Sequence, residues 1–480
     1  MTKTSPEGQR PKAVPATSQP HVLVSGPTGV GKTRRVLAPA AAMWQGPAVV
    51  VSSKDDLMNL VSPRRDPLCT DRPQLLDLRP VHDPVYPVGV EPVRTDPTML
   101  VRDSDECMTL AELLIQVGSI GMGGSTENVT DGGLWDSLAV PPLAGLIWAA
   151  SPLADRWMGK GVRGIHWLMP AMEVTDIDAE TAGQLDAARD NGTLGELPPS
   201  WWTTSTALEA AGKSILAMRL MGLLDMDPRQ RDSVKINLQK AVGPWLRDSI
   251  RRSDLPIFDP GRLDRQGATL YILAPADGVA AAAAVSVIDA LIHRWREKES
   301  AGRSEARLLM VIDELPNTAP LPKLTTYIGE ARGLGVNIIA AVQGSSQFAR
   351  KFGNAQLVEL RDVFPATMVM LGAPEWEALE AAARWSGLTL RRTETIDAGS
   401  GRRTLSDSVG QLVEPAELAP GGLEVARLLS RGTAGQLVAV PDWSRLMEDR
   451  QDTSPDRPLL TAWVLQSITD GRNAATPTPS

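Results

Sequence analysis

A glycine-rich run near the amino terminus has the spacing of a phosphate-binding loop. Four residues separate Gly26 from Gly31, and Lys32 and Thr33 follow directly. In such a loop the backbone amides surround phosphates, the lysine neutralises the β- and γ-phosphates, and the threonine hydroxyl ligates Mg²⁺. The sequence therefore predicts a site for ATP and Mg²⁺. The complete run is Gly26, Pro27, Thr28, Gly29, Val30, Gly31, Lys32 and Thr33.

An apolar stretch that ends in two carboxylates is the second candidate for chemistry. Residues 308–312 are aliphatic, and Asp313 and Glu314 follow them. Ligands of open α/β sheets bind at the carboxyl ends of strands, where both acids would lie. We expect Asp313 to join Thr33 around Mg²⁺ and Glu314 to polarise an attacking water. The second acid favours hydrolysis, because a small-molecule kinase would use the hydroxyl of its substrate.

Two further polar residues could act on the terminal phosphate. Gln343 follows the apolar run 336–342, where a glutamine could sense the γ-phosphate or orient water. Arg332 precedes a glycine turn and could reach the nucleotide of a neighbouring subunit as an arginine finger. The alternatives are an ordinary amide at the end of a strand and a solvated arginine.

Short aliphatic and β-branched runs are the elements that would position these residues. Continuous apolar runs of this length are typical of strands buried on both faces of a parallel sheet. The pattern at 278–299, alanine-rich and then charged, predicts one of the intervening helices. We therefore expect an α/β fold with a mainly parallel sheet. The expected strands are 21–25, 48–52, 269–274, 308–312, 336–342, 366–371 and 436–440.

The segment 105–255 has a different pattern, without strand-like runs. Tryptophan, methionine and leucine recur there at helical spacing, which predicts an all-α inserted domain with these residues in its core and loops at 118–133 and 190–199. Pro244 should kink its helix. The expected core positions are Leu208, Ala211, Ile215, Met218, Leu223, Val234, Leu238, Val242, Trp245 and Leu246. The expected division is a disordered lead-in (1–20), a discontinuous nucleotide-binding domain (21–104 and 256–445), the inserted domain (105–255) and a tail (446–480).

The composition excludes several classes of protein. The net charge is -8, so DNA contacts would need a local basic lining. The two cysteines and four histidines lack the spacing of metal ligands, and a reducing cytoplasm fits so few cysteines. No apolar stretch is long enough to span a membrane. Arginine pairs at 391–392 and 402–403 flank the polar segment 393–401, a loop that could contact a phosphate backbone or could simply be solvated.

The order of these motifs resembles the type IV secretion coupling proteins, the conjugative DNA-transfer ATPases of the TraG/TraD type. The similar segments are 21–24 before the glycine-rich run, 49–54, 133–136, 313–317 and 330–343. The resemblance implies a RecA-like P-loop core interrupted by an all-α domain, a homo-hexameric ring, and coupling of DNA and a relaxase-type protein substrate to the secretion channel. It gives Arg332 the role of finger in trans, Gln343 that of sensor, and the helical insertion a part in substrate recognition. The implied location is cytoplasmic, with recruitment to the inner face of the cell membrane.

The sequence departs from the family pattern at three points. The N-terminal transmembrane region usual in the family is not among these residues, Ser52-Ser53 replaces an acid and a proline before Lys54, and Leu315 replaces an aromatic residue. Two alternatives remain open, a cytoplasmic DNA translocase without a secretion partner and an ATP-binding substrate receptor with little turnover. The motif set Lys32, Thr33, Asp313, Glu314, Gln343 and Arg332 argues against the receptor.

Overall fold

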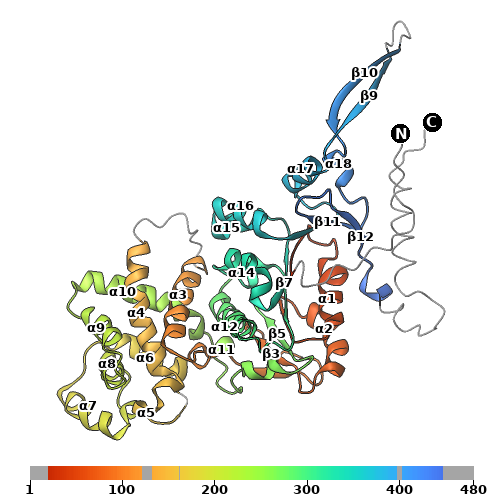
Figure 1. The fold of residues 1–480 in the computed structure, drawn as a ribbon. Coiled ribbons are helices and arrows are strands. Elements are labelled where there is room, and N and C mark those ends of the chain that lie inside the picture. Colours follow the sequence, from red (N-terminus) through yellow and green to blue (C-terminus); the bar gives the residue numbers. More distant parts are fainter. Residues whose placement is uncertain (1–19, 122–131, 162, 397–402, 447–480) are drawn as a thin grey trace.

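A ten-stranded sheet forms the centre of the molecule (Figure 1). The computed structural model describes residues 20–121, 132–161, 163–396 and 403–446. Eight strands run parallel, while β11 is antiparallel to β8 and β12 is antiparallel to β11. The order across the sheet is β12 (Gln436–Ala439), β11 (Val425–Ser430), β8 (Ala366–Val369), β1 (His21–Ser25), β7 (Val336–Val342), β6 (Leu308–Ile312), β2 (Ala48–Ser52), β5 (Thr269–Leu273), β3 (Gln74–Asp77) and β4 (Glu91–Val93).

The α/β fold and mainly parallel sheet predicted from the sequence are confirmed. All seven expected strands form, with β5, β8 and β12 one or two residues shorter than expected. Every residue of β2, β5 and β6 is buried, as expected for strands covered on both faces. The sequence pattern missed β3, β4 and β11, which lie toward the two edges of the sheet.

Helices cover both faces of the sheet. Alternate residues of β2 face different cores, since Val50 packs with the α1 and α2 side and Val49 with the α12 and α14 side (Figure 1). The helices outside the insertion are α1 (Ala38–Met43), α2 (Asp55–Arg65), α12 (Ala281–Ser300), α13 (Leu315–Thr318), α14 (Leu324–Glu330), α15 (Gln347–Phe352), α16 (Asn354–Val363), α17 (Trp376–Trp385) and α18 (Pro415–Leu418).

The segment between β4 and β5 is helical, and its first long helix packs against α12. The chain leaves the sheet at Arg94 and returns beside it, because Phe258 N donates to Arg94 O at 2.8 Å. The two connections are therefore joined where they meet the sheet. The helices are α3 (Ser104–Gly121), α4 (Gly132–Ala150), α5 (Asp155–Met158), α6 (Gly164–Glu173), α7 (Ala179–Asn191), α8 (Trp201–Ala210), α9 (Ser214–Gly222), α10 (Pro228–Val242) and α11 (Asp248–Arg251).

Several details of the helical prediction were wrong. The expected loop 118–133 is helical at both ends, since α3 continues to Gly121 and α4 begins at Gly132. Three expected core positions, Ile215, Met218 and Leu246, are instead 75%, 69% and 67% exposed, because they lie on the solvent side of their short helical segments. Pro244 does not kink a helix, since α10 ends at Val242 and the proline lies in the first turn of a separate 3₁₀ helix, where its missing N–H is harmless.

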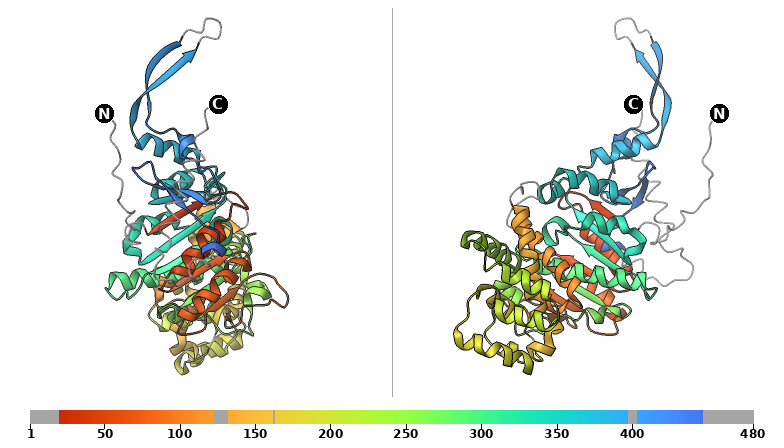
Figure 2. Two further views of the ribbon diagram at one scale, coloured as in Figure 1. Left: turned by 90° about the vertical axis from the view of Figure 1, so that its right-hand side faces the viewer. Right: turned by 60° about the vertical axis from the view of Figure 1, so that its left-hand side comes forward.

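The first part of the segment expected to be a loop, residues 393–396, belongs instead to a strand of an antiparallel hairpin. Strands β9 (Leu388–Ile396) and β10 (Arg403–Gln411) pair along their whole length, and residues 397–402 lie outside the described ranges. The hairpin projects from the end of the molecule opposite the helical insertion (Figure 2). Arg391 forms an ion pair with Glu414, and Arg392 with Asp407. Acidic partners thus already occupy both arginines.

Within the ranges that the structure describes, no single helix combines the length and apolar character of a membrane span. Two consecutive helical segments, Trp135–Ala150 and Pro152–Met158, meet these criteria of length and composition only when taken together, and they are bent by 70°. The expected disordered lead-in lies outside the described residues except for its last residue, Pro20, and the expected short helix at 459–467 lies outside them entirely.

Candidate nucleotide site

The glycine-rich run forms a tight loop between β1 and the π-helical turn η1 (Thr33–Leu37). Gly29 and Gly31 have φ angles of 86° and 90°, which glycine adopts without the steric cost that a side chain imposes. A Cβ on Gly31 would also lie 2.9 Å from the Arg35 side chain. The backbone therefore has the compact shape that lets amides converge on a phosphate.

Lys32 is held inside this loop. The residue is 8% exposed, and its Nζ donates to Gly26 O at 2.6 Å and to Pro27 O at 3.2 Å. Burial lowers the pKa of Lys32, whereas the charges of Asp313 and Glu314 raise it. The ammonium group thus lies between the loop and the two acids, where it can neutralise a phosphate.

Asp313 and Thr33 meet at the end of β6. Thr33 Oγ1 donates to Asp313 Oδ2 at 3.2 Å, although the two residues are 280 positions apart in the chain. Burial and the charge of Glu314 raise the pKa of Asp313 to about 6, against the opposite effects of Lys32 and Thr33. A hydroxyl and a carboxylate in contact are the protein ligands that Mg²⁺ takes in P-loop sites.

Glu314 and Gln343 form the second contact across the site. Gln343 Nε2 donates to Glu314 Oε1 at 3.2 Å. Glu314 has φ = 51°, a left-handed conformation that is costly for a residue with a side chain and that often occurs at functional sites. The turn that imposes it is stabilised by Thr318, whose Oγ1 donates to Asp313 O at 2.8 Å.

The strand order explains why these residues converge. Strand β7 pairs with β1 on one side and with β6 on the other. Because all three strands are parallel, Gln343 emerges between the glycine-rich loop and the acidic pair. The sequence motifs predicted each element, but their order across the sheet is a finding of the structure.

Arg332 lies at the other end of β7. Its backbone belongs to the short 3₁₀ helix η9 (Ala331–Leu334), which precedes the strand. Ten residues, 333–342, separate it from Gln343, and the seven that form β7 alone extend over roughly 20 Å. Arg332 is thus separated from the nucleotide site of its own chain.

A carboxyl-terminal segment next to the site was missed from the sequence. Residues 440–446, here called the strap, follow β12 and lie against η1. Arg34 forms a double hydrogen bond with Asp442 at 2.7 and 3.0 Å, and this guanidinium holds the pKa of Asp442 far below its usual range. Arg35 Nη1 donates to Val440 O at 3.0 Å. The partners of these two contacts are 408 and 405 positions apart in the chain, so only the fold brings them together.

The residues of the site fit Mg²⁺ and a nucleoside triphosphate. Across the described ranges, no group of three or more His, Cys, Asp and Glu side chains could hold a metal ion. Mg²⁺ at phosphate sites needs no such cluster, since it takes one or two protein oxygens together with substrate phosphates and water. The pair Thr33–Asp313 beside Lys32 provides that arrangement.

Comparisons with known proteins place this site in a family context. Residues 307–420, which include the acidic pair, Arg332 and Gln343, match the family described as the TraM recognition site of TraD and TraG. No curated protein matches the sequence of the chain significantly.

Solved structures of a coupling protein have the same fold. The unbound bacterial conjugative coupling protein TrwBdeltaN70 aligns over 89% of this chain and 86% of its own, with 17% identity and a TM-score of 0.54. Its sulphate-bound trigonal form has 17% identity and a TM-score of 0.55, and the alignment covers 89% of this chain and 87% of that one. TrwB in complex with ADP and Mg²⁺ has 17% identity and a TM-score of 0.53, with the same coverage of 89% and 87%.

The chain has the fold of the P-loop NTPases with a RecA-like core, and its glycine-rich loop lies after β1 in that fold. Within that class, the predicted resemblance to the TraG/TraD-type coupling proteins is confirmed by the family match at residues 307–420 and by the fold of TrwB.

Proposed function

We propose that the chain is an Mg²⁺-dependent ATPase that couples hydrolysis to the recruitment or translocation of a DNA–protein substrate into a type IV secretion channel. One observation carries the proposal: Lys32, Thr33, Asp313, Glu314 and Gln343 converge at one edge of the sheet. The nucleotide part is supported by TrwB, which binds the ATP analogue ADPNP and ADP with Mg²⁺.

Each residue has a distinct role in the proposed reaction. The backbone N–H groups of the loop 26–33, Pro27 excepted, bind the phosphates, and Lys32 neutralises their charge. Thr33 and Asp313 would hold Mg²⁺, which supplies Lewis-acid stabilisation of phosphate charge when bound. Glu314 accepts a proton from the attacking water, and Gln343 orients Glu314 and the water through its amide.

The position of Arg332 supports a ring in which each site lies between two copies. Its backbone is at the far end of β7 from Gln343, so we propose that it acts on the site of a neighbouring copy and not on its own. A neighbour in a head-to-tail ring could present its own Arg332 to that site, where it would stabilise transition-state charge. We propose a homo-hexamer on the family pattern.

The substrate is proposed from the family match. The TraG/TraD description and the coupling-protein fold favour conjugative DNA with a relaxase-type protein as the cargo, and channel components as partners at the inner face of the membrane. The helical insertion (105–255 in the proposed division) would recognise cargo. A DNA translocase without a secretion partner shares the same core and remains the second candidate.

DNA-stimulated ATP hydrolysis tests the proposal. We expect the purified chain to hydrolyse ATP with Mg²⁺, and DNA to increase turnover several-fold. Lys32→Ala should remove the activity, because the loop loses its phosphate-neutralising charge. Turnover of Lys32→Ala within twofold of the parent would refute the site, and turnover unaffected by DNA would favour the receptor alternative.

A further inference from the structure

A buried carboxylate lies behind the nucleotide site. Glu375 is 2% exposed and directly precedes α17. Its Oε1 accepts hydrogen bonds from Ser25 Oγ and from Ser345 N, both at 2.7 Å, and its Oε2 accepts one from Ser345 Oγ at 2.8 Å. Burying a charged group costs free energy unless the group is hydrogen-bonded. These three hydrogen bonds therefore strongly favour one arrangement of the two chain segments that carry the donor groups.

The donors lie on the two chain segments that form opposite sides of the site. Ser25 is the last residue of β1 and directly precedes Gly26, whose carbonyl accepts from Lys32. Ser345 follows Gln343 by two positions, and Gln343 in turn donates to Glu314. One carboxylate therefore joins the start of the phosphate-binding loop to the loop that carries Gln343.

The surrounding packing restricts movement of the second loop. A Cβ on Gly344 would lie 2.6 Å from Pro374 Cγ, so the loop 343–345 lies directly against the turn that carries Glu375. Arg361 Nε donates to Ser345 Oγ at 2.8 Å. This guanidinium brings a positive charge to the hydrogen-bonded network around the carboxylate.

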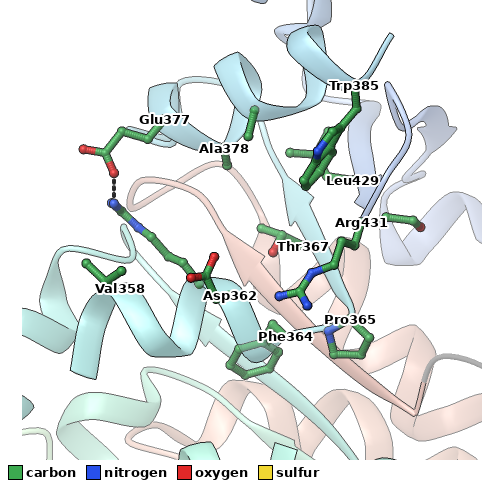
Figure 3. Close-up of a pocket in the computed structure, with 13 residues that line it drawn as sticks. Val358, Asp362, Phe364, Pro365, Thr367, Glu377, Ala378, Trp385, Leu429 and Arg431 are labelled. Carbon is green, nitrogen blue, oxygen red and sulfur yellow. Dashed lines mark hydrogen bonds and ion pairs between the residues drawn. The ribbon is translucent and has the colours of Figure 1, made fainter. Parts of the chain in front are cut away.

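Arg361 also connects this network to a cavity. The cavity has a volume of about 500 Å³ and lies between α16, β8, α17 and β11. Arg361 and Glu377 both line this cavity and form an ion pair. Figure 3 shows Glu377, Phe364 and Trp385 among the lining residues. The network thus extends from the phosphate-binding loop, through Glu375, Ser345 and Arg361, to the wall of this cavity.

We propose that Glu375 is a positioning residue for ATP hydrolysis. It holds the loop that carries Gln343 at a fixed place relative to the phosphate-binding loop, and so acts on the reaction through Gln343. This inference rests on the proposed ATPase function. Because Glu375 contacts the loops and not the phosphates, its loss should affect turnover and leave nucleotide affinity nearly intact.

Glu375→Gln is the direct test. It keeps the size of the side chain, removes its negative charge, and replaces one of the two hydrogen-bond-accepting oxygens by a donor group. We expect kcat for ATP to fall by at least about tenfold with KM within about twofold of the parent, because small misplacements of catalytic groups are costly. Glu359→Gln is the matched control. It makes the same chemical change at an exposed carboxylate of α16, outside the hydrogen-bonded network, and should leave kcat unchanged.

A double-mutant cycle separates positioning from a general loss of structure. When Gln343→Ala is already present, Glu375→Gln should lower kcat no further, since the group through which it acts is gone. An equal fall of kcat in both backgrounds would overturn the proposal, as would a kcat of Glu375→Gln within twofold of the parent. If Glu375→Gln does not fold, Ser345→Ala takes its place and should show the same pattern with a smaller effect.

Hydrogen exchange separates failure of this inference from failure of the proposed function. Without nucleotide, amides 343–347 should exchange faster in Glu375→Gln than in the parent, because Ser345 N loses its ionised acceptor. A parent without ATPase activity would refute the proposed function and with it the catalytic consequence, and the exchange result would then decide only whether Glu375 fixes the loop 343–345. Unchanged exchange in that segment would overturn it.

Discussion

The two neighbouring acids of the site have different hydrogen-bond partners. Asp313 is hydrogen-bonded to Thr33, whereas Glu314 is hydrogen-bonded to Gln343 and adopts a left-handed backbone. Neighbouring carboxylates with different partners suit different tasks, here the proposed metal binding by Asp313 and proton acceptance by Glu314. The burial that prepares Asp313 for a cation also disfavours its charge while the cation is absent.

Asp313→Asn should stabilise the nucleotide-free protein at neutral pH. Burial raises the pKa of Asp313 from 3.8 to about 6, so ionisation costs folding free energy above pH 6 and nothing below pH 4. The variant, which lacks this cost, should gain at most about 3 kcal/mol at pH 8. Its advantage in denaturant unfolding should shrink as the pH falls from 6 to 4. An advantage that grows on acidification would contradict this.

At the scale of elements, the strap connects the edge strand β12 to the helical turn η1, which directly follows the phosphate-binding loop. Its side chains Trp443 and Leu446 pack into the same core as Val36 and Leu37 of η1. The ion pair Arg34–Asp442 is partly exposed and contributes little by comparison. Apolar burial is therefore the main attachment of the strap.

Trp443→Ala should detach the strap. The side chain is 9% exposed, and truncating a buried tryptophan costs about 3 kcal/mol or more. We expect amides of 440–446 to lose protection in hydrogen exchange while the central strands keep theirs. Trp376→Ala is the control, because Trp376 is 53% exposed and its loss should leave the strap protected. Unchanged exchange in Trp443→Ala would show that other contacts hold the strap.

The sequence allowed prediction of those parts of the site that lie in contiguous motifs. The glycine-rich loop and the acidic strand are local patterns, and the seven apolar runs marked strands for the same reason. The hydrogen bond between Ser25 and Glu375 could not be predicted from the sequence, because 350 positions separate the two residues. The hairpin was missed because β9 and β10 carry charged and polar residues on an isolated two-stranded ribbon, without the apolar run of a buried strand.

At the scale of the whole molecule, the helical insertion and the hairpin lie at opposite ends of the sheet domain (Figure 2). The nucleotide site occupies one edge of the sheet, and Arg332 lies at the other end of β7. A chain with this arrangement can meet a copy of itself through two different surfaces, which is the condition for a closed ring.

Mixing two inactive variants tests the ring. Arg332→Ala and Lys32→Ala should each lack turnover alone, but an interface between them can combine an intact loop with an intact arginine. Equal mixing should restore up to about a quarter of parent turnover if neighbours assort at random. No recovery in mixtures that co-assemble by size measurement would exclude action of Arg332 in trans.

Plasmid transfer from donor cells is the most direct measurement of coupling between hydrolysis and DNA export. Donors that lack this gene should regain transfer with the parent chain and should stay at background with Glu314→Gln, which keeps the shape of the proposed base and removes its function. The purified variant should still bind ATP. Transfer at parental frequency with Glu314→Gln, when its ATPase is abolished, would contradict the proposed coupling of hydrolysis to transfer.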